Sequence, residues 1–227
     1  MNIQYNKQKQ EVKDDPVLGL FISARKYFEE QKKNLGIGAM VIVGVVLVGF
    51  FMQSTRESSL KKANDAFGKA MVAYESGDAA ATIEGFTQVT RAYKGTPFAS
   101  YSAYILGSLY FSKGEYAPAI IWLQSAIASN GGFISGEATE ALATCYENQG
   151  TTDKAIQYYQ KALTDTRISY RFPTIRYKLA LLLSDKGQPQ PAIKYLQQII
   201  SDTTLTAQEY REKSQIVLAG LTAAKVQ

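Results

Sequence analysis

The side chains that usually carry out catalysis are scarce in this sequence. The chain contains no histidine, which removes the commonest general base and a common metal ligand. The single cysteine, Cys145, lies in an apolar helical pattern and is expected to be a buried structural thiol. Asp14-Asp15 is more typical of a helix cap than of a catalytic pair, and Asn130-Gly131-Gly132 lacks the Lys-Ser/Thr of a phosphate-binding loop. We therefore predict no enzyme, no cofactor and no metal site.

Better candidates for binding are side chains that lie a fixed number of residues before or after three small residues in the sequence, Ala70, Gly107 and Ala143. Lying on one face, they would form a groove for apolar or basic extended segments, such as those of unfolded client polypeptides. An alternative is that they pack against the chain's own last helix or against a permanent partner. The candidate residues are Phe67, Met71, Tyr101, Tyr104, Ser108, Phe111, Glu137, Glu140 and Thr144.

A repeat of 36 to 37 residues supplies the elements that would position these side chains. Gly77, Gly114, Gly150 and Gly187 are separated by 37, 36 and 37 residues. Such glycines commonly end a helix, because the position that follows it requires a positive φ. Mostly apolar side chains recur six, nine and twelve residues after each glycine, and a small residue lies seven residues before it. Each unit therefore predicts a pair of helices that stacks on its neighbours to bury an apolar face.

The segments 107–119 and 143–155 resemble the tetratricopeptide repeat, an all-α solenoid. The residues that carry this resemblance are Gly107, Tyr110, Gly114, Tyr116 and Ala119, and in the next repeat Ala143, Tyr146, Gly150 and Ala155. It implies about four helix pairs and a capping helix. The expected pairs are 56–76 with 78–93, 97–113 with 115–129, 135–149 with 152–165, and 171–186 with 189–201.

Further helices are predicted at the two ends of the chain. The capping helix, about 206–224, would turn an apolar side formed by Tyr210, Ile216, Val217 and Leu221 toward the stack. In the tail, Asp15-Pro16 fits an N-cap followed by proline at the first helical position. The helix expected over 16–33 is amphipathic. It would lie on a membrane surface, dock on a partner, or simply extend the segment that follows.

An apolar segment follows this tail helix. Eighteen residues from Leu35 to Met52 carry no charge, and the uncharged stretch extends to Thr55. At about 1.5 Å per residue, such a helix just crosses a hydrocarbon core of about 30 Å. The 34 residues before it and the lack of an Ala-x-Ala-like site argue against a cleaved signal peptide. We expect a tail (1–34), a transmembrane helix (35–55) that contacts the lipid bilayer, and a repeat domain (56–227).

The charge distribution bears on topology and partners. The net charge of +5 is spread along the chain, which argues against binding of nucleic acid. Seven basic residues precede the apolar segment. A short basic tail before a large domain favours a cytoplasmic tail, with the repeats on the other side of the membrane.

The order of tail, single span and repeats resembles the YfgM-like family of ancillary subunits of the bacterial Sec translocon. The resemblance implies a single-pass inner-membrane protein with a cytoplasmic N-terminus and a periplasmic repeat domain. It also implies two kinds of partner, the Sec channel subunits and a membrane-anchored chaperone like PpiD. The expected function is that of a non-enzymatic adaptor that links secreted chains to periplasmic chaperones.

Two other functions are compatible with the same residues. The chain would in one case be a structural scaffold of another envelope complex, for assembly or motility. In the other case the topology is inverted, and the repeats form a cytosol-facing receptor tethered to the membrane. The proteins that copurify with the chain would separate these alternatives.

Overall fold

The computed structural model describes residues 16–129 and 132–223, and the described residues form helices without any strand. The all-α fold class expected from the repeat is confirmed. Asp14, Asp15, Asn130 and Gly131 lie outside the described residues, so the cap and the turn predicted there stay predictions. The chain divides into two compact units, Met1–Ser58 and Ser59–Gln227.

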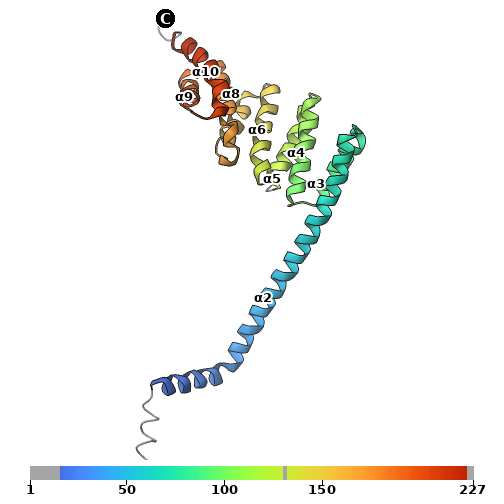
Figure 1. The fold of residues 1–227 in the computed structure, drawn as a ribbon, viewed down its shortest axis with the longest axis vertical. Helices are drawn as coiled ribbons and strands as arrows, with labels where there is room; N and C mark the ends of the chain where they lie inside the picture. The colour runs from blue at the N-terminus through green and yellow to red at the C-terminus, as the bar shows by residue number, and fades with distance from the viewer. Residues whose placement is uncertain (1–15, 130–131, 224–227) are drawn as a thin grey trace, which may run out of the picture. The chain divides into compact units, whose positions relative to one another are not determined.

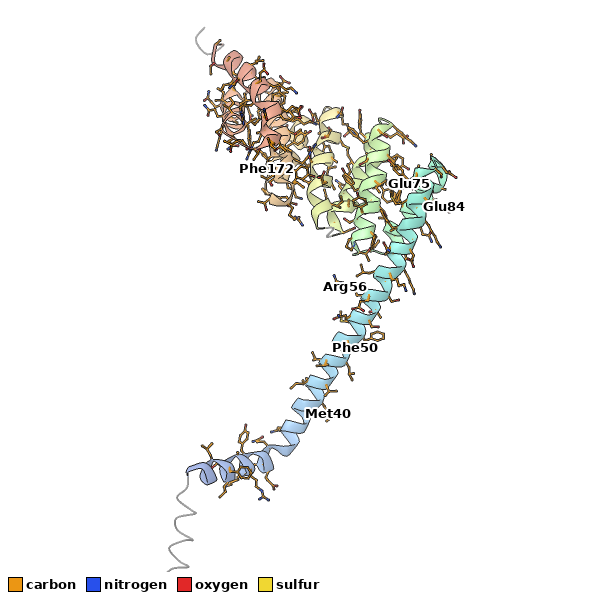
Figure 2. The ribbon with its side chains drawn as sticks, viewed as in Figure 1. Met40, Phe50, Arg56, Glu75, Glu84 and Phe172 are labelled. Carbon is orange, nitrogen blue, oxygen red and sulfur yellow. The ribbon has the colours of Figure 1, made fainter. Side chains whose placement is uncertain are left out.

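The first unit contains most of α2 (Pro16–Glu75), a helix of 60 residues that runs on into the second unit. The apolar segment and the first repeat helix are therefore one continuous helix. From Met40 onward α2 includes an 18-residue apolar window of which no residue is buried. Figure 2 shows Met40 and Phe50 along this part of the helix, and Phe50 is 75% exposed. By length and composition this part of α2 can cross a membrane.

The second unit is a stack of helix pairs followed by one more helix (Figure 1). Its helices agree with the predicted pairs to within three residues at each end that can be compared. After the last turns of α2 they are α3 (Ala79–Ala92), α4 (Pro97–Ser112), α5 (Tyr116–Ala128), α6 (Phe133–Asn148), α7 (Thr152–Ala162), η1 (Thr166–Arg171), α8 (Phe172–Asp185), α9 (Pro189–Ile200) and α10 (Leu205–Ala223).

The four repeat glycines follow the first helix of each pair, as their spacing predicts. Gly77, Gly114, Gly150 and Gly187 have φ angles of 78°, 75°, 74° and 72°. A residue with a Cβ rarely adopts this left-handed conformation, so glycine allows the chain to leave one helix and enter the next within a short turn.

Two of the three positions predicted to be apolar form the core of the stack, and the isoleucines six residues after each glycine are half-buried. The residues nine and twelve positions after the glycines are all 0% exposed: Phe86, Leu123, Tyr159, Leu196, Val89, Ala126, Ala162 and Ile199. The small residues allow close approach, since a Cβ added to Gly107 would lie 2.6 Å from Cγ of Leu123. The predicted repeat register is therefore confirmed, because a shift of one residue would turn these side chains away from the core.

Two features differ from the prediction. The 3-10 helix η1 occupies a segment expected as a plain connection, and it is held there by Ile168, which is fully buried. In α10, Ile216 was expected on the apolar side but is 67% exposed. Val217 and Leu221, expected on the same side, do pack against the core of α8 and α9, together with Leu218. The ring of Tyr210 packs against that of Tyr177 in α8. The predicted apolar side of α10 is therefore confirmed apart from Ile216, which at about 100° per residue falls outside the face that packs on the stack.

Candidate functional site

Six of the nine predicted groove residues line one pocket of about 220 Å³ in the repeat unit. They come from α4 and α6, the first helices of two consecutive pairs. Leu123, Ala141 and Arg171 are the other lining residues. The six are Tyr104, Ser108, Phe111, Glu137, Glu140 and Thr144.

The repeat register explains why these side chains meet. Ser108 and Thr144 lie one residue after Gly107 and Ala143, which are both buried against the second helix of their pair. Side chains at equivalent offsets on stacked helices point in the same direction, so they form a continuous surface. Helices α4 and α6 contact each other directly, which brings the two sets of side chains to one pocket.

Both acidic residues of the pocket are engaged by η1. Glu140 is only 5% exposed and accepts two hydrogen bonds from Arg171, at 2.8 Å from Nε and 2.6 Å from Nη2. Glu137 accepts a hydrogen bond from the hydroxyl of Tyr170. The hydrogen bonds to Glu140 raise the pKa of the Arg171 guanidinium above its ordinary value. This bidentate pairing offsets the buried charge of Glu140, and the pocket keeps the formal negative charge of Glu137.

Tyr104 of the pocket and Tyr170, which is bonded to the pocket residue Glu137, are hydrogen-bond donors at neutral pH. Burial, with a further effect of the Glu137 carboxylate, raises the pKa of Tyr104. Burial and the hydrogen bond to Glu137 raise the pKa of Tyr170 to about 12. Both hydroxyls therefore stay protonated. The pocket offers aromatic surface, neutral hydroxyl groups and one carboxylate, which is chemistry suited to binding.

A polar network joins α6, α7 and α8 beside the pocket. The hydroxyl of Tyr159 donates to Glu147 and lies 2.9 Å from Oγ1 of Thr144. Nζ of Lys178 donates to the same hydroxyl at 3.1 Å and lies 3.4 Å from Glu147. Burial raises the pKa of Tyr159, so its hydroxyl stays neutral. The network provides partners for polar atoms that the stacking of three helices removes from water.

The other three predicted residues belong to an aromatic cluster formed by α2 and α4. The ring centroid of Phe67 lies 5.6 Å from that of Phe98 and 5.7 Å from that of Tyr101. Phe67 and Met71 are half-buried against the core, so they contribute mainly to packing. Tyr101 is 44% exposed, and its ring centroid lies 6.4 Å from that of Tyr104, which connects the cluster to the pocket.

Sequence reasoning missed Tyr170 and Arg171, which belong to η1 and therefore to no repeat position. Their partners on α6 lie 33 and 31 residues away in the sequence, and no periodic pattern links them. A weak signal was Gly136, a glycine inside a helical pattern next to Glu137. A Cβ there would lie 2.9 Å from Cγ2 of Ile168, so glycine at this position allows η1 to pack on α6.

Metal binding and nucleophilic catalysis were considered for the part of the chain that the structure describes. Those residues contain no group of three or more His, Cys, Asp or Glu placed to hold a metal ion. Cys145 is buried, as predicted, and burial raises its pKa to about 11. A thiol with this pKa is a poor nucleophile at neutral pH.

Known proteins share this architecture. The family model described as a tetratricopeptide repeat-like domain matches residues 25–166, and a tetratricopeptide repeat model matches residues 175–202. The crystal structure of MamA is 26% identical with a TM-score of 0.51, and the match covers 70% of this chain and 86% of that one. A tetratricopeptide repeat protein from Parabacteroides merdae ATCC 43184 shares the fold at 17% identity and a TM-score of 0.57. That match covers 72% of this chain and only 61% of the other. The comparison with curated proteins found no match.

Proposed function

Because the chain belongs to the tetratricopeptide repeat-like family, whose helix stacks bind other proteins, we propose that it is a non-enzymatic adaptor of the Sec translocon. Its role would be to link secreted chains, as they leave the channel, to periplasmic chaperones. The apolar part of α2 would anchor it in the inner membrane, with the N-terminus in the cytoplasm and the repeats in the periplasm. The channel subunits and a PpiD-like chaperone would be its partners.

The pocket between α4 and α6 is the observation that carries this proposal. Tyr104 and Ser108 offer hydroxyl groups to backbone carbonyls, and Glu137 offers a carboxylate to a backbone N–H or a basic side chain. Phe111 offers apolar surface beside them. An extended polypeptide presents this combination of groups at regular intervals, and a secreted chain is extended while it crosses the channel.

The size of the pocket favours a protein partner. Small-molecule sites usually have volumes of about 300–1,000 Å³, whereas this pocket measures about 220 Å³. Such a volume fits a side chain rather than a complete cofactor. The exposed aromatic surface of Tyr101 extends the contact area beyond the pocket, as a longer peptide segment requires.

The membrane anchor is supported by α2. Its apolar window has the length to cross a bilayer, and none of it is buried by the rest of the protein. An exposed apolar surface of this size is unfavourable in water and favourable in lipid. The basic tail before it favours the cytoplasmic N-terminus.

A pulldown of the full-length protein from gentle detergent, through a C-terminal tag, tests the proposal. We expect mass spectrometry to identify Sec channel subunits and a membrane-anchored chaperone. Tyr104→Ala should lose the chaperone or the client chains but keep the channel subunits, which α2 would hold. Tyr158→Ala, at an equally half-buried tyrosine of α7 outside the pocket lining, is the matched control and should keep all partners.

Two other results would replace the proposal. Recovery of a different stoichiometric membrane complex without Sec subunits would make the chain a scaffold of that complex. A C-terminal tag that resists protease in intact spheroplasts would place the repeats in the cytosol, as expected for a membrane-tethered receptor.

A further inference from the structure

The tail helix, which is residues 16–33 of α2, exposes a continuous apolar face. Leu20, Phe21 and Tyr27 are 74%, 72% and 62% exposed. At 3.6 residues per turn, Leu20, Ala24 and Tyr27 lie within about 60° of one another, and Phe21 lies beside them. The amphipathic helix of a globular protein buries such a face against a core. The tail helix therefore presents an apolar surface that needs an occupant.

The opposite side of the tail helix is charged. Arg25, Lys26, Glu29 and Glu30 lie there, and Nζ of Lys26 is 3.9 Å from the carboxylate of Glu30 one turn later. Exposed pairs at this spacing are typical of a face turned to water. Ile22 is the exception, since it is 58% exposed on the charged side. With Lys32 and Lys33 the tail helix carries four basic and two acidic residues, a formal charge of +2, so anionic headgroups would add some attraction to the apolar contact.

The tail helix is continuous with the apolar segment that would cross the bilayer. Both belong to α2, and Tyr27 precedes Leu35 by only eight residues. Eight helical residues span about 12 Å, so the apolar face begins close to the point where α2 would enter the lipid. Within the first unit α2 bends between its beginning and the part that carries Met40 (Figures 1 and 2). A bend there allows one part to cross the bilayer while the other follows its surface.

We propose that the tail helix lies in the interface of the lipid bilayer, with Leu20, Phe21 and Tyr27 inserted and Arg25 and Glu29 in water. The inference rests on the membrane anchor of the proposed function but concerns a separate surface. Interfacial helices bury their apolar face about 5–10 Å into the boundary between headgroups and acyl chains. Because the apolar face is large beside a formal charge of only +2, apolar area is the main contribution to insertion, and uncharged phosphatidylcholine is sufficient for it.

Tryptophan quenching in the full-length protein tests this placement. The protein is inserted into nanodiscs of phosphatidylcholine with brominated acyl chains, which quench nearby tryptophan. Trp122→Phe removes the sole native tryptophan, and one tryptophan is then introduced at Phe21, Lys26 or Phe50. We expect strong quenching at Phe50 in the span, and at least about twofold more quenching at Phe21 than at Lys26. Far-UV circular dichroism checks the fold, with Trp122→Tyr as a second background.

The results at Phe21 and Lys26 test the interfacial placement of the tail helix, and the result at Phe50 tests the membrane anchor. Strong quenching at Phe50 with equal, weak quenching at Phe21 and Lys26 would overturn the interfacial placement, leave the anchor intact, and make a protein partner the occupant of the apolar face. Weak quenching at Phe50 would overturn the anchor and the proposed function together. Quenching at Phe21 that appears only when anionic phosphatidylglycerol is added would contradict insertion driven by apolar area.

Discussion

The two halves of the predicted groove use equivalent repeat positions but hold different chemistry. In the first half the ring of Tyr101 contacts those of Phe67 and Tyr104, with centroids 5.7 and 6.4 Å apart. In the second half Glu137 and Glu140 occupy the equivalent positions on α6, and each accepts a hydrogen bond from η1. The solenoid thus determines where a side chain points and leaves its chemistry free to vary.

The two halves are stabilised by different kinds of interaction. Apolar contacts depend on buried area and little on direction, so the aromatic half should tolerate changes that conserve shape. The charged half depends on a few directional pairs around a buried carboxylate. Removal of the partner of Glu140 leaves a buried charge without compensation. The resulting loss of stability is larger than the lost contact area alone would predict.

The largest expected effect is in the core that packs against the aromatic half. Phe86 is 0% exposed, and its ring centroid lies 5.6 Å from that of Phe67. Phe86→Ala should lower the free energy of unfolding by about 3–5 kcal/mol, because it opens a cavity in the core. Urea unfolding followed by the fluorescence of Trp122, which packs against two of the three core clusters of the described residues, measures it. Ile121→Ala, at a 65% exposed position, is the control and should change it by less than about 0.5 kcal/mol.

In the charged half, Arg171→Met should lower the free energy of unfolding by about 2 kcal/mol, because it leaves the buried carboxylate of Glu140 without its cationic partner. The 40% exposure of the Arg171 side chain keeps the loss below that of a fully buried pair. The control is Lys213→Met, which removes an exposed pair with Glu209 and should cost less than about 0.5 kcal/mol. Equal losses for the two variants in urea unfolding would show that the pocket pair contributes no more than a surface pair.

Conservative substitutions sharpen the comparison. Phe67→Leu keeps an apolar side chain in the aromatic cluster and should cost at most about 1 kcal/mol. Glu140→Gln conserves shape equally well but removes the charge that Arg171 neutralises, and it should cost about twice as much. If the same urea experiment ranks Phe67→Leu as the more damaging change, the two halves do not differ in tolerance as described.

The smallest expected effect is a pH dependence. Burial raises the pKa of Cys145 from 9.0 to about 11. The folded state therefore binds the thiol proton more tightly than the unfolded state, so this contribution is fully present below pH 9 and is lost as the pH rises toward 11. We expect a loss of about 1 kcal/mol between pH 9 and pH 10. Cys145→Ala should flatten the pH profile of unfolding between pH 9 and 10, and an unchanged profile would contradict this assignment.

Much of the fold and part of the site could be predicted because they depend on local periodicity. The spacing of Gly77, Gly114, Gly150 and Gly187 predicts where helices end, and counting from Gly107 and Ala143 identifies six of the pocket residues. These inferences need only the helical repeat and the rule that small residues face a neighbouring helix.

The sequence by itself determined the repeat register, the helix ends and the apolar segment of α2, since each depends on the types and spacing of residues close together in the chain. Only the tertiary structure decided that Tyr170 and Arg171 reach α6, that Ile216 of α10 stays exposed, and that Phe67 is mainly a packing residue. The physical reason is that these outcomes depend on contacts between segments distant in the chain. The energies of such contacts depend on the shape and burial of side chains in three dimensions. A local sequence pattern contains no information about either.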